Sequence, residues 1–199
     1  GYSDITALHL GLLARTGRPS WAGPTAAGDF GRTEAQGGVD DVTVGCFQEA
    51  MTGSLQAVGF RTEAEFSGLS RAGTLWGGNL SMVCSLLGTP FMPAVRGGIL
   101  FLEDVNEHPY RVERLLLQLL QAGVLSAQRA VLLGEFSAWE ASPQDRGYSL
   151  RSAVAAVRSR TKTPVLTGLP FGHVPTRLTL PVGLRVRLAV DGRSAYLGW

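Results

Sequence analysis

The clearest pattern of apolar and polar positions lies near the middle of the chain. Residues 99–102 form an uninterrupted apolar run opened by two glycines, which is typical of a strand buried on both faces. The acidic pair Glu103–Asp104 ends this run. Apolar residues then recur at helical spacing between Pro109, a favoured first-turn residue, and Gly123, a favoured end residue. This pattern predicts a buried strand followed by an amphipathic helix that packs on a sheet.

The same alternation of strand and helix continues toward the C-terminus. Residues 129–134 predict a strand, 149–160 an amphipathic helix and 164–169 a third strand, the order typical of parallel β-α-β units. Apolar residues alternate over 184–190, and an Asp-Gly turn leads into 195–197, which predicts a β-hairpin. We therefore predict an α/β fold with parallel β-α-β units and a terminal β-hairpin.

The N-terminal half gives weaker signals. Residues 5–15 predict a helix that ends at Gly17. The apolar residues expected on its buried face are Ile5, Leu8, Leu12 and Leu13. Residues 17–45 are rich in glycine and proline and predict a long loop, which is usually functional or mobile. Helices are expected near 44–51 and 80–87, the second after a strand or turn that runs into a glycine-rich bend.

Composition narrows the classes of function. The 199 residues are 45% hydrophobic and 17% charged, enough to bury a core in one domain or one and a half. A net charge of +2 without a basic stripe argues against a nucleic-acid partner. No apolar run reaches the roughly 18 residues of a membrane span, and no leader is visible, so we expect a cytoplasmic protein without membrane contact. Cys46 and Cys84 are expected to be buried thiols.

Three residue types that can carry out hydrolysis lie at the predicted ends of elements. Glu103 and Asp104 follow a buried strand, where ligands bind in open α/β sheets, although they could equally be a polar strand end or a helix cap. His173 follows the third strand on a glycine-bounded loop, a usual place for a catalytic base. Ser3 stands at the turn into a helix, where Ser3 or Asp4 could be the N-cap or the serine a nucleophile. This pattern permits a nucleophilic hydrolase, and no residue spacing suggests zinc.

Two further features have simpler interpretations than a binding site. Gly77–Gly78 could suggest a phosphate loop, but the lysine and hydroxyl residue of such a loop are missing, so a tight turn is favoured. Trp76 could stack on a ligand, but a packed tryptophan beside a turn is the simpler interpretation.

Four segments resemble the LD-carboxypeptidase family of serine peptidases: GYSDITALHLGL, GTLWGGNLSMVCSLLGTPFMP, GGILFLEDVNEHPYRVERLLLQL and VLTGLPFGHVPTRLTLPVG. The resemblance implies Ser3 as nucleophile, the Asp4 N–H as an oxyanion donor, Glu103 as the acid and His173 as the base. It also implies hydrolysis without metal or cofactor, removal of the terminal D-alanine from murein tetrapeptides during cell-wall recycling, and a homodimer.

Glu107 competes with Glu103 for the role of the acid. Glu103 ends a buried strand, where its carboxylate is fixed and partly desolvated. Glu107 lies in a turn beside Pro109, where water would screen its charge. We therefore assign the acid to Glu103, whose separation from His173 also suits the family.

Family members are longer, and the resemblance implies that residues 1–45 belong to an N-terminal α/β domain carrying the nucleophile turn. Residues 46–71 would connect it to a C-terminal domain, 72–199, with the glutamate and the histidine. We expect residues 1–199 alone to bring these two together but to leave Ser3 mobile or displaced, with negligible hydrolysis. Two other functions stay open: a hydrolase of peptidyl or aminoacyl nucleotides similar to the microcin C self-immunity protein, and a non-catalytic substrate-binding or dimerisation fragment.

Overall fold

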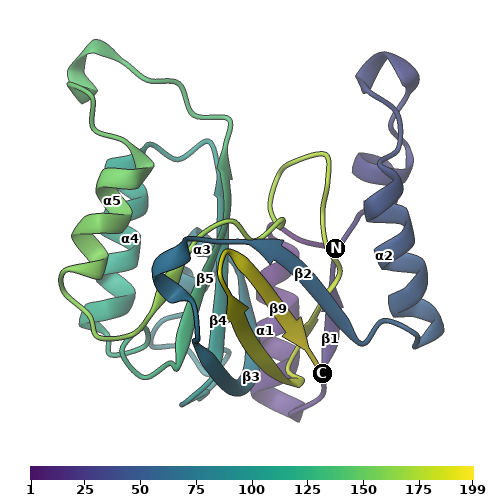
Figure 1. The fold of residues 1–199 in the computed structure, drawn as a ribbon, viewed down its shortest axis with the longest axis horizontal. Helices are drawn as coiled ribbons and strands as arrows, with labels where there is room; N and C mark the ends of the chain where they lie inside the picture. Colours follow the sequence, from purple (N-terminus) through teal and green to yellow (C-terminus); the bar gives the residue numbers. More distant parts are fainter.

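A mixed seven-stranded sheet forms the centre of the protein (Figure 1) in our computed structural model, which describes residues 1–199. Its strand order is β2-β9-β8-β3-β4-β5-β6. The strands are β2 (Ala57–Arg61), β3 (Ser70–Asn79), β4 (Ile99–Val105), β5 (Ala130–Ser137), β6 (Val165–Leu166), β8 (Arg185–Asp191) and β9 (Ser194–Gly198). Two short strands, β1 (Ser20–Ala22) and β7 (Leu180–Val182), pair separately.

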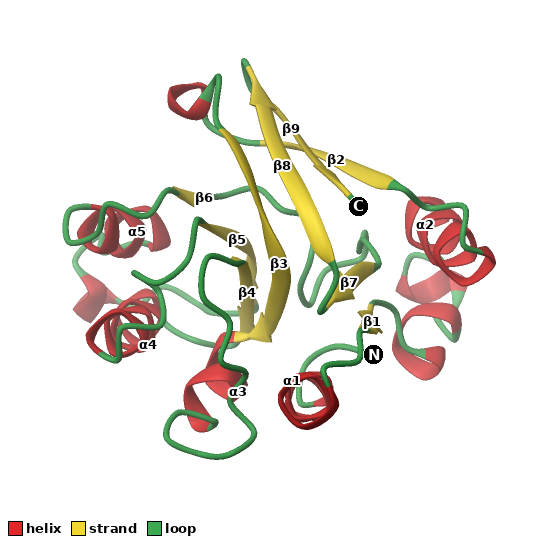
Figure 2. Cartoon of the chain, turned by 90° about the horizontal axis from the view of Figure 1, so that it is seen from below, coloured by secondary structure: helices red, strands yellow, loops and turns green.

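Five α-helices surround the sheet. They are α1 (Ile5–Thr16), α2 (Asp41–Thr52), α3 (Leu80–Ser85), α4 (Pro109–Gln121) and α5 (Leu150–Arg158). Helices α4 and α5 lie side by side against the parallel strands (Figure 2), and α1 contacts β3, β1 and α3. Helix α2 stands apart at the opposite side of the molecule, next to the segment that contains a short π-helical turn, Ala26–Phe30.

Strand β3 joins two differently paired parts of the sheet. Its first half, Ser70–Thr74, runs antiparallel to β8, whereas its second half, Leu75–Asn79, runs parallel to β4. Strands β4, β5 and β6 continue the parallel part, and β8 and β9 form a hairpin. The predicted α/β fold with parallel β-α-β units and a terminal hairpin is therefore confirmed.

The predicted central strand and helix are both present. Every residue from Ile99 to Asp104 in β4 is buried, which explains its unbroken apolar sequence. Helix α4 begins with Pro109 and buries Val112, Leu116 and Leu119. The spacing of these residues turns one stripe of α4 toward the core.

The buried face of α1 differs from the predicted one. Ile5 is 42% exposed and Leu8 67% exposed, whereas Thr6, His9 and Leu10 are buried. The two polar residues on this face are bonded: the Thr6 hydroxyl accepts from the Asn79 backbone N–H, and His9 bonds to Ser20. Polar contacts thus fix the rotation of α1, which apolar spacing alone predicted wrongly.

Gly77 and Gly78 are also placed differently from the prediction, because they lie inside β3 instead of in a bend. Both have positive φ, of 131° and 137°. A Cβ atom on Gly77 would overlap the carbonyl oxygen of Phe101 on β4, and one on Gly78 would overlap the Thr6 side chain. The glycine pair therefore allows β3 to lie unusually close to β4 and α1.

Both cysteines are free and buried, as predicted. Burial raises the pKa of the Cys84 thiol to about 12. No helix has both the length and the apolar character needed to cross a bilayer. The division into 1–45, 46–71 and 72–199 stays a prediction.

Candidate active site

Glu103 and His173, which are 70 residues apart in the sequence, meet at the carboxyl edge of the parallel strands. The Glu103 Oε2 atom lies 2.9 Å from His173 Nδ1. Glu103 has no exposed surface, and its second oxygen, Oε1, has no hydrogen-bond partner. The His173 side chain is 21% exposed. A buried carboxylate thus contacts one ring nitrogen of a histidine that still reaches the surface.

The loop that carries His173 is packed onto the sheet. Phe171 is buried against Phe101 of β4, with ring centroids 5.1 Å apart. Gly172 has a φ of 142°, and a Cβ atom there would lie 3.3 Å from the Glu103 Cβ atom. The Ser137 hydroxyl donates to the His173 carbonyl oxygen at 3.0 Å. These contacts hold the imidazole over the end of β4.

A buried ion pair supports the other side of this loop. Arg177 is 2% exposed, pairs with the buried Asp29 and donates to the Gly172 carbonyl oxygen at 2.7 Å. Its guanidinium lies 3.6 Å from the centroid of the Tyr2 ring, and the Tyr2 ring meets the His173 ring edge-on at 4.8 Å. Asp29, Arg177 and Tyr2 therefore connect the 26–30 turn, the histidine loop and the start of the chain.

Ser3 follows Tyr2 and has a strained backbone. Its φ is 61°, a left-handed value that non-glycine residues rarely adopt. Asp4 occupies the N-cap position of α1, but neither its side chain nor that of Ser3 makes the hydrogen bond of a side-chain cap. No acceptor takes the Asp4 backbone N–H. Asp4 therefore occupies the N-cap position, as one interpretation of the sequence held, but neither side chain caps the helix by a hydrogen bond.

Ser3 is half-buried beside Tyr2, and no hydrogen bond joins its hydroxyl to His173. The structure thus pairs Glu103 with His173 and brings Ser3 to the same region through its neighbour Tyr2. The catalytic roles of Ser3, Asp4, Glu103 and His173 stay predictions.

A second polar network ties α1 to the same edge of the sheet. The Asn79 side chain donates to Asp104 Oδ1 at 2.8 Å, while its backbone N–H donates to Thr6 of α1 at 3.0 Å. The other Asp104 oxygen accepts from the Ser81 N–H and hydroxyl. Asp104 is therefore occupied in joining β3, β4 and α3, and through Asn79 it supports the helix that follows Ser3.

Glu107 and Trp76 do not approach His173. Glu107 forms an ion pair with the exposed Arg111, four residues further along the chain. Trp76 has no exposed surface, and its Nε1 atom donates to Gln128 at 3.1 Å. Trp76 is therefore a packed core residue, as its simpler interpretation held.

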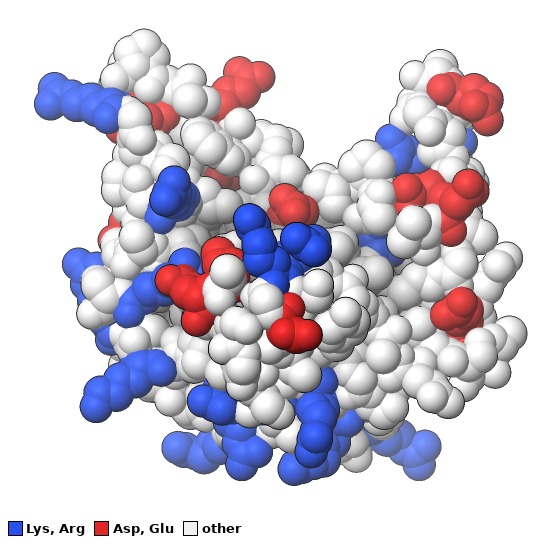
Figure 3. All heavy atoms as spheres, viewed as in Figure 1, with Lys and Arg blue, Asp and Glu red and all other residues white.

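The surface is hollowed between two projecting parts of the chain, the loop over 138–149 and the segment over 26–40 (Figures 1 and 3). A cavity of about 230 Å³ lies beside His173. Its lining comprises Tyr2, Gly28, Asp29, Arg32, His173, Val174, Pro175 and Arg177. The candidate base thus borders a space that a small ligand could enter.

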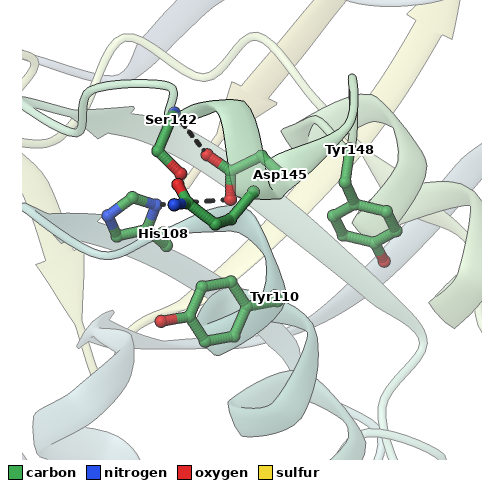
Figure 4. A pocket seen from close by; sticks show the side chains of 6 residues that line it. His108, Tyr110, Ser142, Asp145 and Tyr148 are labelled. Atoms are coloured by element: carbon green, nitrogen blue, oxygen red, sulfur yellow. Dashed lines mark hydrogen bonds and ion pairs between the residues drawn. The ribbon is translucent and has the colours of Figure 1, made fainter.

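A separate cavity of about 560 Å³ lies at the 138–149 loop (Figure 4). His108, Tyr110, Asp145 and Tyr148 point toward it, together with Ser142 and Gln144. The Ser142 backbone N–H donates to Asp145 and lowers the pKa of that carboxyl. None of the predicted site residues lines this cavity.

Comparison with known proteins identifies the family. The model of the LD-carboxypeptidase C-terminal domain matches residues 72–188. The protein named "Probable murein peptide carboxypeptidase" in Bacillus subtilis is 30% identical over 99% of this chain and 61% of its own length. The chain belongs to the LD-carboxypeptidase family. The resemblance inferred from the sequence is thereby confirmed.

Solved structures of LD-carboxypeptidase relatives have the same fold. A muramoyltetrapeptide carboxypeptidase from Oxalobacter formigenes is 42% identical, with a TM-score of 0.91 over 99% of this chain and 66% of that chain. A microcin C7 self-immunity protein bound to aspartyl sulfamoyl adenosine is 25% identical, with a TM-score of 0.83 over 100% of this chain and 66% of that chain. The chain spans about three fifths of the length of the curated relatives from Bacillus subtilis and Streptomyces coelicolor.

Sequence reasoning missed most of the residues that support the candidate active site. Asp29 and Arg177 are 148 residues apart, and neither belongs to a short motif. Thr6 is not among the residues that apolar spacing places on the buried face of the first helix. The one indication in the sequence was that Asp29 lies in the glycine-rich segment 17–45, a long predicted loop of a kind that is usually functional or mobile. The sequence did not indicate which residue Asp29 pairs with.

Proposed function

We propose that the protein carrying this chain is a serine carboxypeptidase that removes the terminal D-alanine from murein tetrapeptides, as peptidoglycan recycling requires. The observation that carries this proposal is the contact between the fully buried Glu103 and His173 Nδ1. A carboxylate in this position orients an imidazole for general base catalysis and stabilises the imidazolium that forms.

In the proposed mechanism, the Nδ1–H group of His173 donates a hydrogen bond to Glu103, which leaves Nε2 as the basic nitrogen. Nε2 removes the proton of the Ser3 hydroxyl while Ser3 Oγ attacks the carbonyl carbon before D-alanine. His173 then gives that proton to the leaving amine. Water releases the peptide from Ser3 by the same steps in a second half-reaction.

The left-handed backbone of Ser3 supports its role as nucleophile. Sharp turns of this kind expose the side chain of a nucleophile at the start of a helix. The unpaired N–H of the following residue, Asp4, is free to donate to the oxyanion that forms during attack. In this proposal the strain at Ser3 is part of the catalytic geometry.

The second candidate is hydrolysis of peptidyl or aminoacyl nucleotides. It is supported by the structural similarity to the microcin C7 self-immunity protein, whose structure was solved with aspartyl sulfamoyl adenosine. The higher identity and TM-score of the muramoyltetrapeptide carboxypeptidase favour the murein peptide. Trp76 gives the nucleotide no stacking surface, because it is wholly buried.

A third candidate is a substrate-binding or dimerisation role without catalysis. We favour an enzyme, because a buried carboxylate bonded to a partly exposed histidine has no evident use in a binding module. We further propose that the protein works in the cytoplasm, where recycled murein peptides are processed, and that it forms a homodimer.

The experiment uses the natural protein that carries this sequence, at its full length. It is incubated with L-Ala-D-Glu-diaminopimelate-D-Ala, and released D-alanine is measured by mass spectrometry. We expect release by the wild-type protein and its loss in Ser3→Ala. A covalent serine probe should label the wild-type protein and not this variant. Cleavage of aspartyl sulfamoyl adenosine without cleavage of the tetrapeptide would favour the second candidate, and neither reaction nor labelling would favour the third.

A further inference from the structure

The cavity of about 230 Å³ beside His173 has a cationic residue that the proposed mechanism does not use. Arg32 lines this cavity together with His173 and Tyr2. We propose that the cavity is the subsite for the free carboxylate of the leaving amino acid, and that Arg32 binds this carboxylate. The inference rests on the proposed function, and it assigns the residue that makes the enzyme select a chain end.

No charged residue around the cavity neutralises Arg32, so its guanidinium is available to bind a ligand carboxylate. Asp29 and Arg177 also line it, but they neutralise each other in their buried ion pair. Arg32 is half-buried and donates through Nη2 to the Gln36 carbonyl oxygen at 2.6 Å. It takes part in none of the salt bridges of the chain. The cavity lining therefore carries one uncompensated positive charge.

The Asp40 carboxylate interacts electrostatically with Arg32 without forming an ion pair with it. The oxygens of Asp40 are hydrogen-bonded to other residues. One of its oxygens accepts from the Thr43 N–H and hydroxyl, and the other accepts from the Thr176 hydroxyl at 2.8 Å. These bonds fix Asp40 at the start of α2. A ligand carboxylate would therefore meet a guanidinium that is positioned but not paired.

The chemistry of the leaving group requires a carboxylate site at this place. In a terminal amino acid, the carboxylate is only two bonds from the nitrogen that His173 protonates. A group that binds the carboxylate must therefore border the same space as the imidazole, and Arg32 does so. A guanidinium also matches the planar geometry of a carboxylate through paired N–H donors.

The first test compares two substrates of the full-length protein: a tetrapeptide ending in D-alanine and the same peptide ending in D-alaninamide. Hydrogen bonds to charged groups contribute enough that Arg32→Gln should lower kcat/KM for the acid by about 10–150-fold. The loss should appear mainly in KM, because the carboxylate is bound in both the ground and transition states. For the amide, the same substitution should change kcat/KM by less than about threefold.

Arg71→Gln provides a matched control. Arg71 is an exposed arginine near the start of β3, at the end of the strand opposite Asn79, so its loss should leave both substrates unaffected. Arg32→Lys should recover part of the activity on the acid, because it keeps the charge but loses the second donor. Equal losses on acid and amide in Arg32→Gln, or no loss on either, would overturn the assignment while leaving the proposed hydrolysis standing.

A binding measurement decides the inference independently of turnover. In Ser3→Ala, calorimetry with both tetrapeptides should give tighter binding of the acid, and adding Arg32→Gln should abolish the difference. If the wild-type protein fails to cleave the tetrapeptide but this acid preference is present and depends on Arg32, the proposed function fails and the carboxylate subsite remains. Equal binding of acid and amide, or binding of neither, would refute the subsite.

Discussion

Replacing Glu103 by glutamine separates the catalytic from the structural contribution of this residue. The substitution keeps the shape of the side chain and removes the negative charge 2.9 Å from His173 Nδ1. A glutamine amide can present either its oxygen or its nitrogen to the ring. The variant therefore loses both the charge and the fixed tautomer that leaves Nε2 free to accept a proton.

The size of the effect follows from the geometry. Opposite unit charges separated by 2.9 Å attract by about 6 kcal/mol at an effective dielectric constant of about 20. This is an upper limit for the stabilisation of the imidazolium, since part of it is offset by desolvation of the buried carboxylate. At about 1.36 kcal/mol for each factor of ten in rate, the limit corresponds to about 10⁴ in kcat. We expect a loss of roughly 10²–10⁴.

The unfolding free energy of Glu103→Gln should change much less than its kcat. Glu103 Oε1 is buried without a partner, so the wild-type protein already bears a cost that a neutral amide reduces. We expect the unfolding free energy of Glu103→Gln to lie within about 1 kcal/mol of the wild-type value, a typical range for a shape-conserving change.

The assay measures D-alanine release in steady state and unfolding by denaturant on the same preparations. Glu107→Gln is the matched control, because the partly buried Glu107 pairs with Arg111 and not with His173, and its kcat should stay within about tenfold of the wild-type value. A larger loss in Glu107→Gln than in Glu103→Gln would refute the assignment of the acid. A loss of activity that merely follows a loss of stability would refute the orienting role.

Three further predictions test other parts of the structure. Ser3→Ala and His173→Ala should each reduce turnover by on the order of 10⁴ or more, and the double variant should lose no more, whereas additive losses would argue against a shared proton transfer. Asp29→Asn should lower the unfolding free energy by about 3–5 kcal/mol in denaturant titrations, because it leaves Arg177 charged and buried; an unchanged value would contradict this. Hydrogen bonds from two threonines and an arginine outweigh the effect of burial and lower the pKa of Glu63 from 4.5 to about 2. Its contribution to stability should therefore be complete above about pH 4.5 and disappear as the pH falls to about 2, so the stability difference between wild type and Glu63→Gln should shrink over this interval; a constant difference would contradict the prediction.

The parts of the fold that the sequence predicted well are those with strong local periodicity. Strand β4 is buried on both faces and helix α4 has a single apolar stripe, so each leaves its own pattern in the sequence. The buried face of helix α1 has no such apolar pattern, because Thr6 and His9 on this face are polar and make specific hydrogen bonds. Apolar spacing contains no information about such bonds.

The candidate site could be predicted only where it coincides with a strand end or a family motif. Glu103 and His173 were placed at the same edge by the order of strands. The Asp29–Arg177 pair was not foreseeable, because the two residues come from irregular segments whose mutual position depends on the whole fold. The π-helical turn at Ala26–Phe30 likewise has no periodic pattern of its own.

The large sequence separation between the site residues has a consequence for folding. Strand β4, helix α4 and strand β5 are consecutive, and β4 pairs directly with β5, so Glu103 can reach its position through local contacts that form early. His173 reaches Glu103 only after a segment of 70 residues closes, and the Asp29–Arg177 pair closes a segment of 148, each at a greater entropic cost. We therefore expect the candidate active site to be among the last parts of the molecule to assemble. A partly folded chain would therefore hold the Glu103 carboxylate in place before the imidazole of His173 arrives beside it.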